Sequence, residues 1–190
     1  MADNYSLQDF ITECGDCFTR SNVPADCVTA IAPLMQRLVA GPKDFLQPGH
    51  FRSNPEHYAR NEIFVADDEC LSLYALVWRP GQWTPVHDHG TWGVVGVVRG
   101  ILEERNYVRT DSHDERMSDI TLLRGGVLLL AAGAITSFVP NPDHIHVTGV
   151  ADDREEVVSL HLYGREMSGF NVYDADAGTR RFIDLPPQKS

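Results

Sequence analysis

The chain has few basic residues: 16 Lys and Arg stand against 27 Asp and Glu, which gives a formal net charge of −11. No basic stripe is present to neutralise phosphates, so neither nucleic acid nor an anionic membrane is expected as a partner. The chain also lacks a long hydrophobic run. Its most apolar segment, residues 127–135, is too short to span a bilayer and is interrupted by Gly133.

Secretory features and cysteine are also scarce. The first residues, Met1–Tyr5, are neither basic nor apolar, so no signal peptide is expected and the cytoplasm is the default location. Reduced thiols are therefore expected rather than disulfides. One pair forms a C-x2-C, but no second pair follows it and it lies in an expected helix, so it is a weak metal or redox signal. The four cysteines are Cys14, Cys17, Cys27 and Cys70.

Hydrophobic periodicity divides the chain into two parts. Residues 6–40 carry apolar side chains at steps of three and four, which predicts helices, and Asn22-Val23-Pro24 predicts a break between two of them. From about residue 59, short β-rich segments separated by turn residues predict an all-β barrel or sandwich. We expect one domain over residues 1–190, with helices in about 1–45 and a β-barrel in about 59–185. The segments expected as strands are Ile63–Ala66, Leu71–Trp78, Val94–Val98, Leu102–Val108, Val127–Leu130 and Val157–Tyr163.

A candidate metal site begins with His87-Asp88-His89. Residues two apart in a strand point to the same face, so both imidazoles could reach one ion while Asp88 points away. Imidazole suits iron, zinc, copper and nickel. The alternative is a pair of ordinary surface histidines.

Two further polar patterns lie near the end of the chain. The segment Ser159-Leu160-His161-Leu162-Tyr163 alternates strictly, so its polar row faces either a barrel interior or solvent, and pattern alone does not choose. The segment Asp143-His144-Ile145-His146 is a second H-x-H. One of its histidines would complete a three-ligand site, and pattern alone does not choose between His144 and His146.

The spacing around the first histidine pair resembles the first cupin motif, G-x5-H-x-H-x3-4-E-x6-G. Gly81 lies six residues before His87 and Gly100 lies eleven after His89, whereas Gly93 occupies the glutamate position. The resemblance covers roughly residues 60–165. It implies a double-stranded β-helix barrel, in agreement with the all-β reading.

Within the cupins the sequence resembles the thiol dioxygenases, the group that includes cysteine dioxygenase and 3-mercaptopropionate dioxygenase. The joint match spans most of the barrel and is more specific than any one element. Because the family has a histidine thirteen residues before the serine of its S-x-H-x-Y segment, the resemblance selects His146 over His144. The matching elements are His87 and His89, Ser159-x-His161-x-Tyr163, His146, Trp78 nine residues before His87, and Tyr58-Ala59-Arg60-Asn61, which is similar to a Y-x-R-N segment.

The resemblance implies one Fe(II) per chain, held by His87, His89 and His146, and no organic cofactor. It implies addition of both atoms of O2 to the sulfur of a small carboxylated thiol, with L-cysteine as the first choice and cysteine sulfinic acid as the product. Three neutral histidines leave the site more positive than the common set of two histidines and a carboxylate. This charge favours a thiolate as an additional ligand, because metal binding lowers the pKa of a thiol.

The resemblance also assigns roles to the remaining residues. Tyr163 would donate a hydrogen bond near the O2 and the substrate carboxylate, His161 would orient Tyr163, and Ser159 would orient His161. Arg60, beside Tyr58, would clamp the substrate carboxylate with its planar fork. Apart from the resemblance, a surface ion pair is the simpler interpretation of Arg60. Residues 90–98 contain no cysteine, so no cross-link to Tyr163 is expected, as in bacterial members.

Several alternatives stay open. The same chemistry could act on 3-mercaptopropionate or on mercaptosuccinate, and the second would need another cation such as Arg165. A cupin enzyme that uses zinc or nickel is a further alternative. A non-catalytic cupin that binds a metal or ligand belongs to a different class, since a fold alone does not fix function. A monomer and a small homo-oligomer are both compatible with the sequence.

Overall fold

The computed structural model describes residues 5–41, 45–68, 70–111, 117–140 and 144–185. Its helical elements are α1 (Leu7–Arg20), α2 (Pro24–Ala40) and the 3-10 turn η2 (Pro48–Phe51). A capping box at Ser6 and Asp9 starts α1, and Pro24 occupies the first turn of α2, where its missing N–H costs nothing. The predicted break between two helices is confirmed. No helix in the described ranges is long and apolar enough to cross a membrane.

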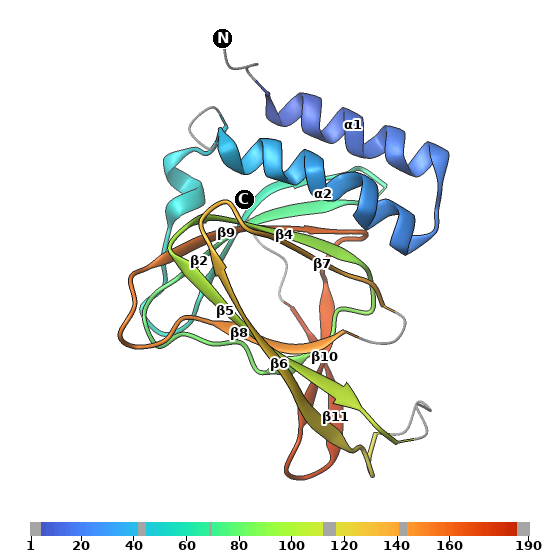
Figure 1. Ribbon diagram of the computed structural model, residues 1–190, viewed down its shortest axis with the longest axis vertical. Coiled ribbons are helices and arrows are strands. Elements are labelled where there is room, and N and C mark those ends of the chain that lie inside the picture. Colours follow the sequence, from blue (N-terminus) through green and yellow to red (C-terminus); the bar gives the residue numbers. More distant parts are fainter. Residues whose placement is uncertain (1–4, 42–44, 69, 112–116, 141–143, 186–190) are drawn as a thin grey trace.

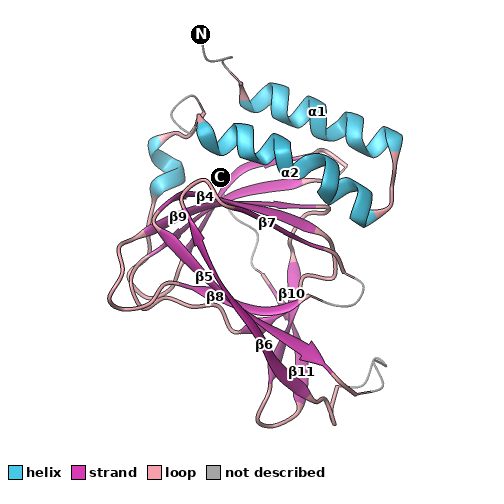
Figure 2. Ribbon diagram, in the orientation of Figure 1, coloured by secondary structure: helices cyan, strands magenta, loops and turns pink. Residues whose placement is uncertain are grey.

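The rest of the described chain is built of antiparallel strands in two sheets. The first sheet has the order β1-β2-β9-β4-β7, and the second has the order β11-β10-β3-β8-β5-β6. The prediction of a mostly β barrel with an N-terminal helical segment is confirmed (Figure 2). The strands are β1 (Ala59–Val65), β2 (Ser72–Trp78), β3 (Val86–His87), β4 (Gly93–Arg99), β5 (Ile101–Arg109), β6 (Leu122–Ala131), β7 (Ile135–Phe138), β8 (Ile145–Gly149), β9 (Val157–Tyr163), β10 (Gly169–Asp174) and β11 (Thr179–Asp184).

Both helices lie on one side of the barrel, over the first sheet (Figure 1). Helix α2 packs against β4 and β7, and α1 packs on α2. All seven residues of β9 are consequently buried, because one face meets the helices and the other meets the barrel interior. Leu160 and Leu162 belong to the helix-side core, while Tyr163 belongs to the interior core. The alternating pattern of this strand did not show whether its polar row faces the barrel interior or solvent. Because the helices cover the leucine face, the row of Ser159, His161 and Tyr163 faces inward.

Two glycines of the cupin-like spacing form turns that a residue with a side chain would strain. Gly81 and Gly100 both have φ of +80°, a region that glycine adopts without penalty. Gly81 precedes β3, and Gly100 joins β4 to β5. The spacing thus reflects two tight turns on either side of the histidine pair.

Candidate metal centre and its cavity

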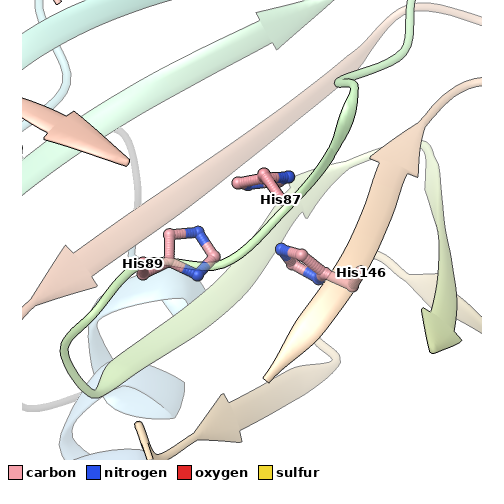
Figure 3. A group of neighbouring side chains, drawn as sticks. All are labelled: His87, His89 and His146. Atoms are coloured by element: carbon pink, nitrogen blue, oxygen red, sulfur yellow. The ribbon is translucent and has the colours of Figure 1, made fainter. Parts of the chain in front are cut away.

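Three histidines converge inside the barrel (Figure 3). His87 ends β3, His89 lies in the following loop, and His146 lies on β8, where it pairs directly with His87 in the sheet register. One ring nitrogen from each lies within 4.8 Å of the other two. All three side chains are buried, which distinguishes them from ordinary surface histidines.

The protonation of these rings suits a metal ion. Nδ1 of His87 lies 3.0 Å from the carbonyl oxygen of Pro85, which can only accept, so that nitrogen carries the proton and Nε2 keeps its lone pair. Nδ1 of His89 and Nε2 of His146 are buried and have no hydrogen-bond partner among the described residues. Burial, followed by the charges of neighbouring histidines, lowers the pKa of His87 and His89 well below 6.5. Neutral imidazoles with free lone pairs are the form that binds a metal, so this set of donors fits one.

The second H-x-H contributes only one histidine to the cavity. His146 lines the cavity, whereas His144 stacks on Phe138 with ring centroids 4.9 Å apart. Nε2 of His144 lies 3.4 Å from Oε1 of Glu104, and Nδ1 of His146 lies 3.5 Å from Oε2 of the same carboxylate. Sequence reasoning missed Glu104, because its place beside the histidines depends on the pairing of β5 with β8.

A side chain at position 93, where the motif has its glutamate, would force its neighbours to shift. A Cβ added to Gly93 would lie 2.4 Å from Cζ of Phe138 and 3.0 Å from the backbone oxygen of Leu162. Phe138 fills this space and stacks on His89, with ring centroids 4.5 Å apart. An aromatic wall therefore replaces the carboxylate position beside the three histidines.

The polar row on β9 forms a continuous hydrogen-bonded chain. Ser159 Oγ lies 2.9 Å from Nε2 of His161, and Nδ1 of His161 lies 3.3 Å from the hydroxyl of Tyr163. The indole N–H of Trp78 donates to Ser159 Oγ at 2.9 Å, a contact that the sequence did not suggest. Burial lowers the pKa of His161 to about 3 and raises the pKa of Tyr163, so at neutral pH the row is uncharged.

The histidines and Tyr163 open into a cavity of about 420 Å³. Arg60 and Tyr58 also line it, as the resemblance implied. The guanidinium carbon of Arg60 lies 4.0 Å from the ring centroid of Tyr74, and its buried Nε has no hydrogen-bond partner in the described ranges. Tyr58 stacks on Trp78 at 4.5 Å. Apolar side chains, Leu76, Met167, Phe170 and Leu185, complete much of the lining.

Arg165 and the cysteines, which the sequence also singled out, are not among the described residues that line the cavity. Arg165 donates from Nη2 to the carbonyl oxygens of His89 and Gly169, each at 3.0 Å, and so holds the loop that carries His89. All four cysteines are free; three are buried and Cys70 is exposed, and none is among the described residues that line the cavity. The expectation of an uncross-linked Tyr163 agrees with this placement.

The family is decided by comparison along the sequence. A model of the family "Cysteine dioxygenase type I" matches residues 1–176. The chain belongs to this family. Membership indicates thiol dioxygenase activity in general, with a small-molecule substrate, O2 and a metal ion, for which the histidine cluster offers ligands.

Solved structures with related folds are more distant. A double-stranded β-helix protein from Klebsiella pneumoniae is 17% identical, with a TM-score of 0.47 over 66% of this chain and 91% of its own. A cupin protein from Ralstonia eutropha is 12% identical, with a TM-score of 0.45 over 68% of each chain. A cupin-like protein from Thermotoga maritima is 16% identical, with a TM-score of 0.38 over 72% of this chain and 86% of its own. These TM-scores are too low to carry an argument. The fold assignment therefore rests on the strand pairing observed in this chain.

Proposed function

We propose that this family member is an Fe(II)-dependent dioxygenase that converts L-cysteine to cysteine sulfinic acid. The observation that supports it is the convergence in one cavity of three neutral histidines, the row ending at Tyr163 and the Nε of Arg60, which has no hydrogen-bond partner among the described residues. The reaction adds both oxygen atoms of O2 to a thiolate and gives a sulfinate. Its atoms and electrons balance without a further reductant, so the reaction needs no organic cofactor.

Iron would be held by His87, His89 and His146. Once bound, Fe(II) supplies the redox chemistry that lets O2 react with a thiolate sulfur. The protein determines the charge of this site, because three neutral ligands leave the positive charge of the ion uncompensated. An anionic thiolate is thereby favoured over a neutral thiol.

Arg60 would bind the carboxylate of the substrate. The Tyr74 ring packs against its guanidinium and holds it in place. Its buried Nε, which has no partner among the described residues, needs an acceptor. A carboxylate offers two acceptor oxygens in the geometry of the guanidinium fork. The distance between carboxylate and sulfur in the substrate then fixes where the sulfur lies relative to the histidines.

Tyr163 would donate its hydroxyl proton into the cavity. The indole of Trp78 can only donate, so we assign the Ser159 hydroxyl proton to Nε2 of His161, and the Nδ1 proton of His161 to the Tyr163 oxygen. This order leaves the Tyr163 O–H free to meet a substrate carboxylate or an oxygen atom. Many of the lining residues are apolar and offer that proton no competing acceptor.

The lining also bears on the choice of thiol. Arg60 is the one arginine or lysine among the described lining residues, which supports a monocarboxylate over mercaptosuccinate. The described lining contains no carboxylate for the ammonium group of cysteine. This observation makes 3-mercaptopropionate, which has the same acid and thiol without the amine, the second candidate.

The four free thiols are consistent with a reducing cytoplasm as the site of this reaction.

The test is oxygen uptake by anaerobically prepared, Fe(II)-loaded protein given cysteine, 3-mercaptopropionate, mercaptosuccinate or cysteamine. We expect uptake with cysteine and a product heavier by two oxygen atoms from labelled O2. Cysteamine lacks the carboxylate and should react poorly if Arg60 acts as proposed. Metal binding without uptake on any thiol would instead support a non-catalytic cupin, and activity restored only by zinc or nickel would support a different enzyme.

A further inference from the structure

Glu104 is a buried carboxylate that the proposed reaction does not use. It lies on β5, its residue is 3% exposed, and on the described chain its ion-pair partners are two imidazoles rather than Lys or Arg. Burying a carboxylate is costly unless its partners are well placed. A carboxylate at this buried position therefore depends on the two imidazoles beside it.

The position of Glu104 lies directly behind one of the candidate ligands. Its Oε2 is 3.5 Å from Nδ1 of His146, the nitrogen on the opposite side of the ring from Nε2. Thr148, the cross-strand partner of Glu104, places its hydroxyl 3.3 Å from the same Nδ1. A hydroxyl can donate or accept, whereas an ionised carboxylate can only accept. The carboxylate therefore favours the tautomer in which Nδ1 of His146 carries the proton.

His144 holds the other end of the carboxylate. Its Nε2 lies 3.4 Å from Oε1, and its ring is fixed by stacking on Phe138 at an interplanar angle of 6°. Glu104 thus has one histidine on each oxygen.

We propose that Glu104 is a positioning residue of the metal centre, which fixes the ring orientation and tautomer of His146 while His144 fixes Glu104. This proposal rests on the function proposed above for the ligands His87, His89 and His146. The comparison with His87 supports it, because a backbone carbonyl does the same for that ring. Partners of this kind orient metal-bound histidines, and losing one typically costs about 10–100-fold in metal affinity.

The competing possibility is a second metal ion. Glu104, His144 and His146 offer ligand atoms within 4.8 Å of one another, and His146 belongs to both groups. An ion there would have to displace the proton from Nδ1 of His146. Metal stoichiometry separates the two cases: a positioning role predicts one equivalent per chain, and a second site predicts two.

The experiment measures metal affinity rather than turnover. Zn(II) is titrated into metal-free protein against a chromophoric chelator, and the Co(II)-loaded protein is examined by absorption. Glu104→Leu should bind about 100-fold more weakly and Glu104→Gln, whose amide oxygen can still accept, about 10-fold more weakly. Glu103→Gln is the matched control, since Glu103 is the neighbouring buried carboxylate but pairs with Arg105 and Arg154. Its affinity should equal that of the wild type.

A second readout distinguishes positioning from a general loss of structure. In ¹⁵N spectra of the imidazoles, His146 should be a single Nδ1-protonated tautomer in the wild type and in Glu103→Gln, and a mixture in Glu104→Leu. If the leucine variant does not fold, Glu104→Gln carries the test. Unchanged affinity in the Glu104 variants, or two equivalents in the wild type with one lost on substitution, would overturn the proposal. The two proposals can fail separately. If metal binding depends on Glu104 but the protein oxidises no thiol, the proposed dioxygenase function is wrong and the positioning role of Glu104 still holds.

Discussion

The two H-x-H segments have the same sequence pattern and different structures. In the first, both His87 and His89 point into the cavity, and the residue between them points away. In the second, only His146 enters the cavity, while His144 packs outside it against Phe138 and Glu104. The pattern alone thus does not determine how many ligands a segment contributes. The surroundings of each ring do.

The central residues of the two segments show why. Asp88 accepts hydrogen bonds from Asn171 and from the hydroxyl of Tyr173, the latter at 2.6 Å. Ile145 packs in a small apolar cluster that contains the same Tyr173. One segment is thus held from behind by hydrogen bonds and the other by apolar contact. Both attachments fix which way the adjacent histidines point.

The sharpest test of the comparison removes one histidine of the second segment at a time. His146→Ala should weaken metal binding by at least about 100-fold, beyond the range of an outer partner, because it removes a candidate ligand. His144→Ala should cost about 10-fold or less, since it only releases Glu104. Competitive Zn(II) titration measures both. A larger loss in His144→Ala would refute the choice of His146.

The attachments behind the histidines should differ in their contribution to stability. Ile145→Ala removes a side chain that is 1% exposed and should lower the free energy of unfolding by about 2–5 kcal/mol. Asp88→Ala removes the hydrogen bonds that Asn171 and Tyr173 donate to this carboxylate and should cost about 1–3 kcal/mol. Urea unfolding of metal-free protein compares them. Equal stability of Asp88→Ala and wild type would show that this hydrogen-bonded attachment is dispensable.

Lowering the pH should reduce the free energy of unfolding because the buried imidazoles are neutral, and this effect should be smaller than those of the substitutions above. Burial lowers the pKa of His161 to about 3, while the unfolded chain titrates near 6.5. Below about pH 6.5 the unfolded state binds more protons than the native state, so stability falls as the pH falls towards 3. Each such histidine should contribute about 0.7 kcal/mol of loss between pH 7 and pH 6. His161→Gln should show a shallower pH slope in urea unfolding, and an identical slope would contradict the assignment.

Much of the fold could be predicted because its signals are local. The helical periodicity before residue 41 and the break at Pro24 match α1 and α2, and all six expected strand segments fall within or beside observed strands. Five strands were missed, β3, β7, β8, β10 and β11, and two of them show why. β3 has only two residues, and β10 mixes Asn171 and Asp174 with apolar positions because it anchors Asp88 and forms a turn.

The site was less predictable where it depends on strand pairing. Most residues named from the family motif line one cavity, since a motif records positions that the fold brings together. Two do not: Ser159 lies behind His161, and Asn61 donates to the backbone oxygens of His50 and Arg52. Glu104 has no motif of its own, and its place behind His146 arises only when β5 pairs with β8. The direction of the β9 row likewise required the helices over Leu160 and Leu162. Sequence patterns describe a strand's two faces but not which neighbour covers each.

Phe138 also limits how this centre could change over time. A single exchange of Gly93 for glutamate would not restore a carboxylate ligand, because the new side chain would start 2.4 Å from the ring of Phe138. Phe138 itself supports both His89 and His144, so it cannot be reduced without loosening the rings on either side. The two changes would have to arrive together, each being harmful alone. The three-histidine arrangement is in this sense buttressed by an aromatic ring that occupies the space a fourth ligand would need.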